Sequence, residues 1–113
     1  MDMDVTELGA GVTCVRLNGR LDAAGADTIG LKFTAVVVSQ GRPAVVDLSG
    51  VSFIASMGIR LLISAAKGLS LKGAKMVLFG AQPLVQEVLE QTAIDQIIDI
   101  AASEAEALAR ATA

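Results

Sequence analysis

Two short apolar runs constrain the fold of this chain more than any other feature. Ala44–Leu48 and Met76–Phe79 are almost free of polar residues, which is typical of strands that helices cover on both faces. Between the runs, apolar residues recur at the three- and four-residue spacing of one helix face, at Ile59, Leu62, Ile63 and Ala66. A connection of this length allows a right-handed crossover, so the two runs predict parallel strands in an α/β domain.

The first third of the chain adds a hairpin and a helix. Val5–Leu8 and Val12–Leu17 are β-prone stretches separated by Gly9-Ala10-Gly11, a pattern typical of two antiparallel strands. A second break at Asn18-Gly19 is followed by a helical pattern that ends before Gly41-Arg42-Pro43. The apolar face of this helix consists of Ala26, Ile29, Phe33, Val36 and Val37.

The last third predicts a helix, a strand and a second helix. Pro83 suits the first position of a helix, whose inward side chains are expected to be Leu84, Val85, Val88 and Leu89. A short final strand is indicated by Ile97, Ile98 and Ile100. Ser103 with Glu106 is a capping-box pattern that opens a helix to about Ala109. We expect one domain over residues 1–113, frayed over residues 107–113, with a mixed sheet of four to five strands and about four helices.

Composition excludes several classes of function. Hydrophobic residues make up 53% of the 113 residues, enough for a compact core. Without His and with Cys14 alone, the chain has no His acid–base relay, no Cys/His zinc site and no internal disulfide. We expect Cys14 to be a small core residue, and the sequence predicts neither a metal nor a cofactor, since no nucleotide-binding glycine motif occurs.

Charge and hydropathy bear on partners and location. The net charge is −3 and no Lys/Arg cluster occurs, so nucleic acid is not expected as a ligand. No apolar run approaches the roughly 18 residues of a membrane span, and the N-terminus is acidic where a secretory signal would be basic. We therefore expect a cytoplasmic protein that does not insert into membranes.

The segment after Ala44–Leu48 is the most distinctive. A loop over Val51–Ala55 is expected to lead into a helix that opens at Ser56 and stops at Gly68 or Gly73. Ser56 is the natural N-cap of this helix, where its hydroxyl would only accept from first-turn amides. The same geometry would favour a phosphate on Ser56, because a helix start presents free amides and a positive dipole end.

Two neighbours of Ser56 also allow two interpretations. Gly58 permits either the close approach of a partner or tight packing of the helix. Arg60, four residues after Ser56, is either a donor to a phosphate or a solvated side chain.

At this segment the sequence resembles the STAS domain family. The run from Ala44 to Ile59, AVVDLSGVSFIASMGI, is similar to the family signature, and Val15–Asp22 is similar to its earlier strand and Gly-x-Leu-Asp element. Gly73–Leu78 and Ile94–Ile100 also fit, so the resemblance covers nearly the whole chain. It implies a STAS-like fold and a role like that of bacterial anti-sigma-factor antagonists.

The resemblance implies a phosphorylation switch at the helix start. In phosphorylated members an acidic residue, two hydroxyl residues and a glycine stand there, and an anti-sigma factor with serine kinase activity phosphorylates one hydroxyl. These positions correspond to Ala55, Ser56, Met57 and Gly58, so the acid and one hydroxyl are missing. If the kinase uses the first hydroxyl, Ser56 is the phosphorylation candidate and a phosphatase would reverse the modification; if it uses the second, the chain is a constitutive binder.

The expected partner-binding residues surround Ser56. They are Asp22, Ile54, Ala55, Ser56, Met57, Gly58, Ile59 and Arg60, with an apolar patch around Ile54, Met57 and Ile59. Asp22 is included through the resemblance, and it could instead cap the first helix.

The residues also bear on two other functions. The first is a STAS subunit of a lipid-transport ATP-binding-cassette system, which would bind its ATPase without phosphorylation. Ala55 stands in place of the acidic residue and Met57 in place of a hydroxyl residue, and both departures favour this alternative. The second is an enzyme with Ser56 as nucleophile, which we do not expect because no His exists and no Lys lies at a suitable spacing to act as its base.

Overall fold

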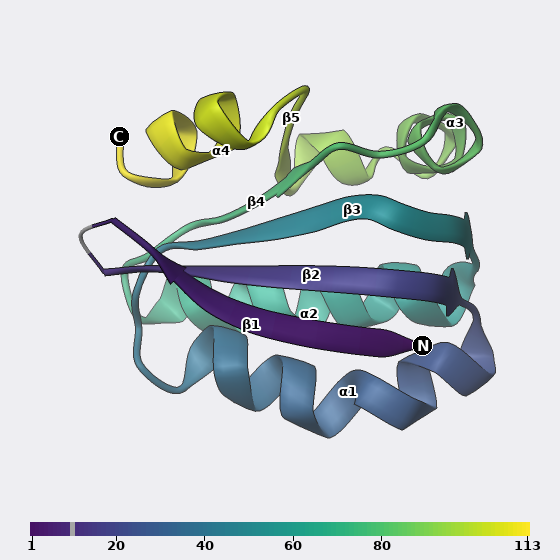
Figure 1. The fold of residues 1–113 in the computed structure, drawn as a ribbon, viewed down its shortest axis with the longest axis horizontal. Coiled ribbons are helices and arrows are strands. Elements are labelled where there is room, and N and C mark those ends of the chain that lie inside the picture. Colours follow the sequence, from purple (N-terminus) through teal and green to yellow (C-terminus); the bar gives the residue numbers. More distant parts are fainter. Residues whose placement is uncertain (10) are drawn as a thin grey trace.

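The computed structural model describes residues 1–9 and 11–113, which form five strands and four α-helices. Figure 1 shows how these elements are arranged. The strands are β1 Asp2–Leu8, β2 Val12–Leu21, β3 Ala44–Ile54, β4 Met76–Phe79 and β5 Asp99–Ala101. The helices are α1 Ala23–Val38, α2 Ser56–Leu71, α3 Pro83–Gln91 and α4 Glu104–Ala111, with a 3₁₀ turn η1 at Ile94–Gln96.

One sheet joins all five strands in the order β1-β2-β3-β4-β5. β1 and β2 pair antiparallel, whereas β2 through β5 pair parallel. The predicted mixed α/β sheet with an N-terminal hairpin is therefore confirmed. The predicted turn at Gly9-Ala10-Gly11 includes Ala10, which lies outside the described residues.

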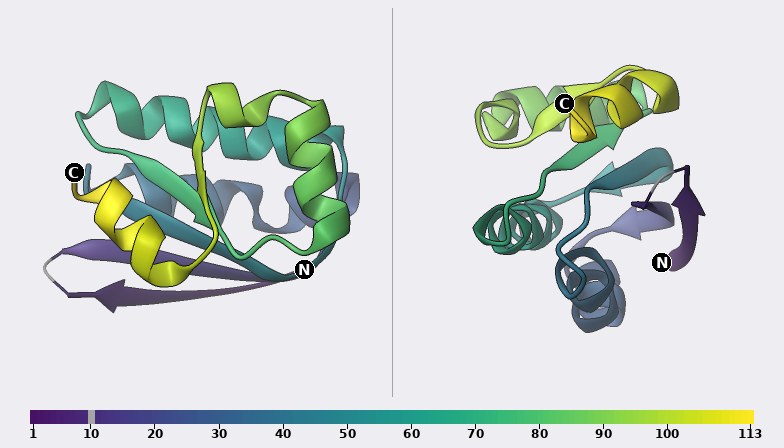
Figure 2. Two further views of the ribbon diagram at one scale, coloured as in Figure 1. Left: turned by 90° about the horizontal axis from the view of Figure 1, so that it is seen from above. Right: turned by 90° about the vertical axis from the view of Figure 1, so that its left-hand side faces the viewer.

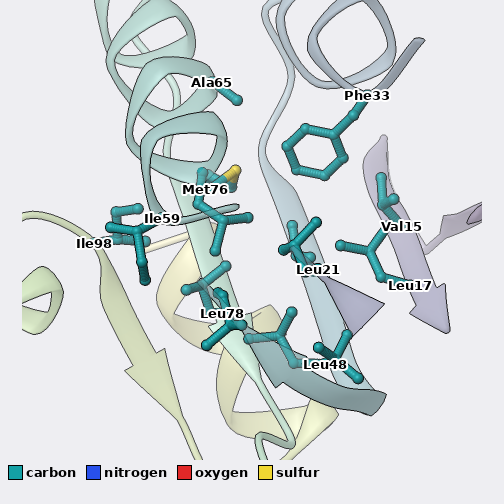
Figure 3. Packing of buried hydrophobic residues seen from close by; sticks show 14 of the residues in the cluster. Val15, Leu17, Leu21, Phe33, Leu48, Ile59, Ala65, Met76, Leu78 and Ile98 are labelled. Atoms are coloured by element: carbon teal, nitrogen blue, oxygen red, sulfur yellow. The ribbon is translucent and has the colours of Figure 1, made fainter. Parts of the chain in front are cut away.

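The larger core fills the space between the sheet and helices α1, α2 and α3. Inward positions of the central strands, such as Val15, Val46 and Leu78, are fully buried there against Phe33 of α1 and Leu62 of α2. Figure 3 shows Phe33 beside Val15 and Leu17. Because successive strand residues alternate in direction, the residues between these positions point to the other face of the sheet.

α4 covers that other face and forms a smaller core with it. Cys14, Val45 and Val77 are buried against Ala107 and Ala111 of α4. Figure 2 shows α1 and α2 on one side of the sheet and α4 on the other. The predicted burial of Cys14 is confirmed, and small alanines let the short helix lie close to the strands.

The first half of the chain contains more strand than the sequence predicted. The break expected at Asn18-Gly19 lies inside β2, where the register with β3 shifts and Gly19 adopts a φ of 116°. The loop expected over Val51–Ala55 is also wrong, because β3 continues to Ile54. Only Ala44–Asp47 pair with β4, so the rest of β3 is an edge with exposed polar positions and lacks the apolar signal of a central strand.

The second half requires smaller corrections. Pro83 opens α3 as predicted, but Leu84 is exposed, because Val85 and Leu89 define the buried face of the helix. Ile97 is exposed after η1 rather than part of a strand. α2 ends before Gly73, whose φ of 84° stops the helix.

The C-terminal helix begins as the capping pattern predicted. Ser103 accepts from the amide of Glu106 at 3.2 Å. α4 continues to Ala111, two residues beyond the expected end. Fraying over residues 107–113 stays a prediction, and the burial of Ala107 and Ala111 favours a short frayed end.

Candidate functional site

The start of α2 lies where β2 and β3 end side by side. Leu21 pairs with Ile54, and the amide of Ala55 donates to the carbonyl of Leu21 at 3.0 Å. The carbonyl of Ala55 then accepts from the amide of Ile59 at 3.0 Å. Ala55 is extended and is therefore the N-cap, so the prediction of Ser56 as N-cap is wrong.

This shift of one residue changes what Ser56 can do. Ala55 has no side-chain acceptor, and no capping hydrogen bond satisfies the first amides of α2. Ser56 is the first helical residue and is exposed, so its hydroxyl is free of a capping role. Met57 beside it is 47% exposed. A hydroxyl and a thioether are thus presented at a helix start with free amides and a positive dipole end.

Gly58 holds this helix start against the sheet. A Cβ at Gly58 would lie 2.5 Å from the carbonyl oxygen of Leu21 and 2.7 Å from its Cγ. Gly58 is itself buried, so the tight-packing interpretation is confirmed. The absence of a side chain at Gly58 lets α2 pack directly against Leu21 at the end of β2.

The apolar surface patch predicted around Ile54, Met57 and Ile59 is wrong in two of its three members. Ile54 is 3% and Ile59 is 8% exposed, and Figure 3 shows Ile59 among the core side chains. Their spacing places them on the inward face of β3 and α2. Of the three, Met57 alone reaches the surface.

Asp22 caps α1 beside this site. Its Oδ1 accepts from the amide of Gly25 at 2.9 Å, and its Oδ2 lies 3.4 Å from Nε of Arg20. The amide of Gly25, assisted by the Arg20 guanidinium, lowers the pKa of the Asp22 carboxyl below its ordinary value. The capping interpretation of Asp22 is confirmed, and its contact with a partner stays a prediction.

Arg20 and Phe53 are neighbours of the site that the sequence interpretation missed. They pair across β2 and β3, and the Arg20 guanidinium carbon lies 4.4 Å from the centroid of the Phe53 ring. A cation and an aromatic face thus lie together at the ends of the strands that lead into α1 and α2. Phe53 was assigned to a loop, so its pairing could not be seen. The signal that could have found the pair is that Arg20 and Phe53 lie at the ends of two adjacent strands, β2 and β3.

A groove runs along the outer side of α1 and α2 and begins near Ser56. Its volume is about 430 Å³, and Met57, Arg60 and Leu61 of α2 face Asp27, Gly30 and Leu31 of α1 across it. Arg60 is exposed one turn after Ser56. Asp27 and Leu31 were not among the predicted site residues, because only the packing of the two helices brings them to α2.

Two absences apply to residues 1–9 and 11–113. No group of three or more His, Cys, Asp or Glu side chains is placed to hold a metal. No helix in the same residues is long and apolar enough to cross a membrane.

The sequence is similar to a known family and to a named relative. A family model described as the STAS domain matches residues 5–107. BtrV of Bordetella bronchiseptica, which carries the name of an anti-sigma factor antagonist, is 33% identical over 104 residues, covering 91% of this chain and 90% of that protein.

Solved structures share the fold over the full length. An anti-sigma-factor antagonist (STAS) domain protein from Planctomyces limnophilus is 29% identical, with a TM-score of 0.87 and 100% of both chains covered. The Bacillus protein SpoIIAA matches in its unphosphorylated form with a TM-score of 0.77 at 20% identity, covering 96% of this chain and 95% of its own. Its phosphorylated form matches with a TM-score of 0.70 at 21% identity, covering 96% and 98%. A family match over nearly the whole chain, with this fold, leads to one conclusion: the chain belongs to the STAS domain family.

Proposed function

We propose that this protein is an anti-sigma-factor antagonist that docks an anti-sigma factor with serine kinase activity through the start of α2, and that phosphorylation of Ser56 ends the binding. The proposed docking surface is made by Asp22, Ala55, Ser56, Met57 and Arg60. Ile54, Gly58 and Ile59 are buried in the free protein, and they position this surface from beneath.

One observation carries the proposal. The Ser56 side chain is exposed at the first position of α2 while Ala55 occupies the cap. A serine that capped the helix would be held by the backbone, and its modification would disturb the fold. The hydroxyl of Ser56 has no such duty, so it is open to a kinase.

The physical effect of a phosphate follows from its charge. A phosphoserine carries a charge of about −1.5 to −2 near neutral pH. Free amides and the positive dipole end of α2 favour that charge locally, and Arg60 one turn away can donate to it. The domain would therefore stay folded, while new charge and its hydration would oppose docking of the partner. SpoIIAA, which shares this fold, has been solved in both phosphorylation states.

The test is affinity capture followed by a kinase reaction. Wild type, Ser56→Asp, Ser56→Ala and the control Ser70→Asp would be used to capture proteins from a lysate of the source cells. Ser70 is exposed near the other end of α2, so the control adds the same charge away from the site. We expect an anti-sigma kinase with wild type and the control, and at least about a tenfold loss with Ser56→Asp.

The captured kinase would then be incubated with ATP and each variant. One phosphate should appear on wild type and none on Ser56→Ala, measured by intact mass. Equal capture by wild type and Ser56→Asp would overturn the switch. Recovery of a transporter ATPase instead would favour the alternative, a STAS subunit of a lipid-transport system. The lack of an acid at Ala55 and the lack of a hydroxyl at Met57 support that alternative.

A further inference from the structure

The groove between α1 and α2 extends beyond the proposed docking surface, with which it shares Met57 and Arg60. It contains one acidic side chain, Asp27, and one basic side chain, Arg60, on opposite walls. The ion pairs within residues 1–9 and 11–113 are formed by other side chains. Asp27 and Arg60 therefore present opposite charges to the surroundings of the groove.

The two charges lie at the same height along the sheet. Leu21 pairs with Ile54 at the ends of the parallel strands β2 and β3, and each strand leads into its helix within two residues. Asp27 is six residues after Leu21, and Arg60 is six residues after Ile54. α1 and α2 lie side by side (Figure 2). The acid and the base are thus equivalent positions of two parallel neighbouring helices.

The same groove contains both a projection and a hollow. Leu31, one turn after Asp27, is 92% exposed on the rim of the groove. Small residues contribute to the lining of the groove: Ala23, Ala26 and Gly30 of α1 and Ser64 of α2. Met57 adds a second exposed apolar side chain at the end of the groove near the start of α2. Leu31 and Met57 are therefore apolar side chains at the groove that a second surface would cover.

We propose that this groove is a homodimer interface, with a second copy of this chain as its occupant. A two-fold axis that runs along the groove places α1 of one copy over α2 of its partner. This arrangement brings Asp27 of each copy to Arg60 of the other, and Leu31 of each copy into the groove of the other. A two-fold interface requires one self-complementary patch. This groove meets that requirement, because Asp27 matches Arg60 in charge and the projecting Leu31 matches the hollow of the groove in shape.

The test is the oligomeric state of the whole chain with charges exchanged. Sedimentation velocity would be recorded over a wide range of concentration for wild type, Asp27→Lys, Arg60→Glu and the double variant. Each single substitution places like charges opposite one another twice in the dimer, so we expect its dimer to dissociate about tenfold more readily. The double variant restores opposite charges in reversed order, and its dimer should return to within about threefold of wild type.

Matched controls separate this effect from a change in net charge. Asp95→Lys and Lys67→Glu make the same charge changes at exposed positions that do not line the groove, and their dimers should equal that of wild type. Leu31→Asp removes the projection at an exposed position, so it should be monomeric with an unchanged circular dichroism spectrum.

Three results would overturn the proposal. The first is a wild type that stays monomeric at every concentration. The second is a dimer that ignores the single charge substitutions, or one that the double variant fails to restore. The third is a monomer in which Asp27→Lys or Leu31→Asp, both outside the proposed docking surface, weakens capture of the anti-sigma factor; this result would assign the groove to that partner.

Discussion

The Ala55 side chain cannot accept the hydrogen bond that an N-cap residue normally accepts. It occupies the N-cap of α2 with a methyl group, although Ser, Thr, Asp and Asn are strongly preferred at this position. The uncapped amides are therefore left to solvent at the point where the proposed partner docks. A helix start that is suboptimal for stability is consistent with a surface that serves binding.

Replacing Ala55 should stabilise the protein. Ala55→Asp supplies an acceptor for the amides of Met57 or Gly58, and we expect a gain of about 1 kcal/mol in the free energy of unfolding. Ala55→Asn, which caps without charge, should give a similar gain, and Ala55→Gly should fall short of that gain by only a few tenths of a kcal/mol, because glycine ranks well above alanine at an N-cap. Urea unfolding measures all three. No gain with either Asp or Asn would contradict the assignment of Ala55 as the cap.

Asp22 shows the opposite situation, because its cap is complete. The amide of Gly25 lowers the pKa of the Asp22 carboxyl, so the folded state prefers the ionised form. The stabilisation from this preference is fully present above the ordinary pKa of Asp and is lost as the pH falls through the lower folded value. Wild type should therefore lose stability on acidification below about pH 4.

Asp22→Asn should remove that part of the acid sensitivity. Asn caps a helix about as well as Asp, so the variant should remain folded at neutral pH. Its melting temperature should fall less than that of wild type between pH 6 and pH 3. Asp95→Asn, which removes a charge from the exposed turn η1, is the control. A parallel pH profile for wild type and Asp22→Asn would show that this carboxyl does not contribute.

Two helical glycines differ in how closely they approach their neighbours, Gly58 of α2 and Gly30 of α1. A Cβ at Gly58 would lie 2.5 Å from the backbone oxygen of Leu21, whereas a Cβ at Gly30 would meet only Leu61 Cδ1 at 3.8 Å. We expect Gly58→Ala to destabilise by about 1–3 kcal/mol, because backbone must move to admit the methyl group. Gly30→Ala should stabilise by roughly 0.5–1 kcal/mol, because a helix-interior glycine is replaced without a clash.

The two glycine variants serve as controls for each other. Both replace a helical glycine with alanine, so a common change in intrinsic helix propensity cancels in the comparison. Chemical denaturation should give shifts of opposite sign. A stabilising effect of Gly58→Ala would mean that α2 is not held against Leu21 in the way described.

The strands were predictable where burial is complete and not elsewhere. β4 and the first half of β3 are covered on both faces, so their sequences are apolar runs that reveal them. The second half of β3 pairs only with β2, and exposed Ser52 interrupts its apolar pattern. That extension takes the strand to Ile54 and moves the cap of α2 from Ser56 to Ala55.

The site was predictable by position but not by surroundings. Sequence reasoning singled out Ser56 and Gly58 as candidates because helix starts carry a recognisable pattern, and it added Asp22 through the family resemblance. It missed Arg20 and Asp27, because their places depend on how strands and helices pack and no local spacing encodes that packing. Ile54 and Ile59 were misjudged for the same reason, since only the assembled core shows which apolar residues face inward.

At the scale of the molecule, the sheet separates two tasks. α1 and α2 cover one face and carry the proposed docking surface, while α4 closes the other face. α4 is short and is held by its buried alanines, with Arg16 of β2 bridging Glu104 at 3.1 Å and Asp47 at 3.3 Å. Exposed ion pairs of this kind contribute little, so burial is the main anchor of α4.

Cys14 reports whether α4 stays in place. The thiol is fully buried beneath α4, and burial raises its pKa above the ordinary value, so the native protein should react very slowly with a thiol reagent. Ala107→Asp places a charge in the same buried cluster, which should displace the helix and cost about 3 kcal/mol or more. The reaction of Cys14 with Ellman's reagent should then become much faster, even where the larger core stays folded.

An exposed residue of α3 supplies the control for this experiment. Leu84→Asp changes an exposed residue on α3, so it should leave the thiol as slow as in wild type. If Ala107→Asp accelerated thiol labelling while the α1–α2 face still captured its partner, the two faces would be separate in stability as well as in task. A native thiol that reacts as fast as free cysteine would contradict the coverage of this face by α4, because no other helix contributes residues to that core within the described chain.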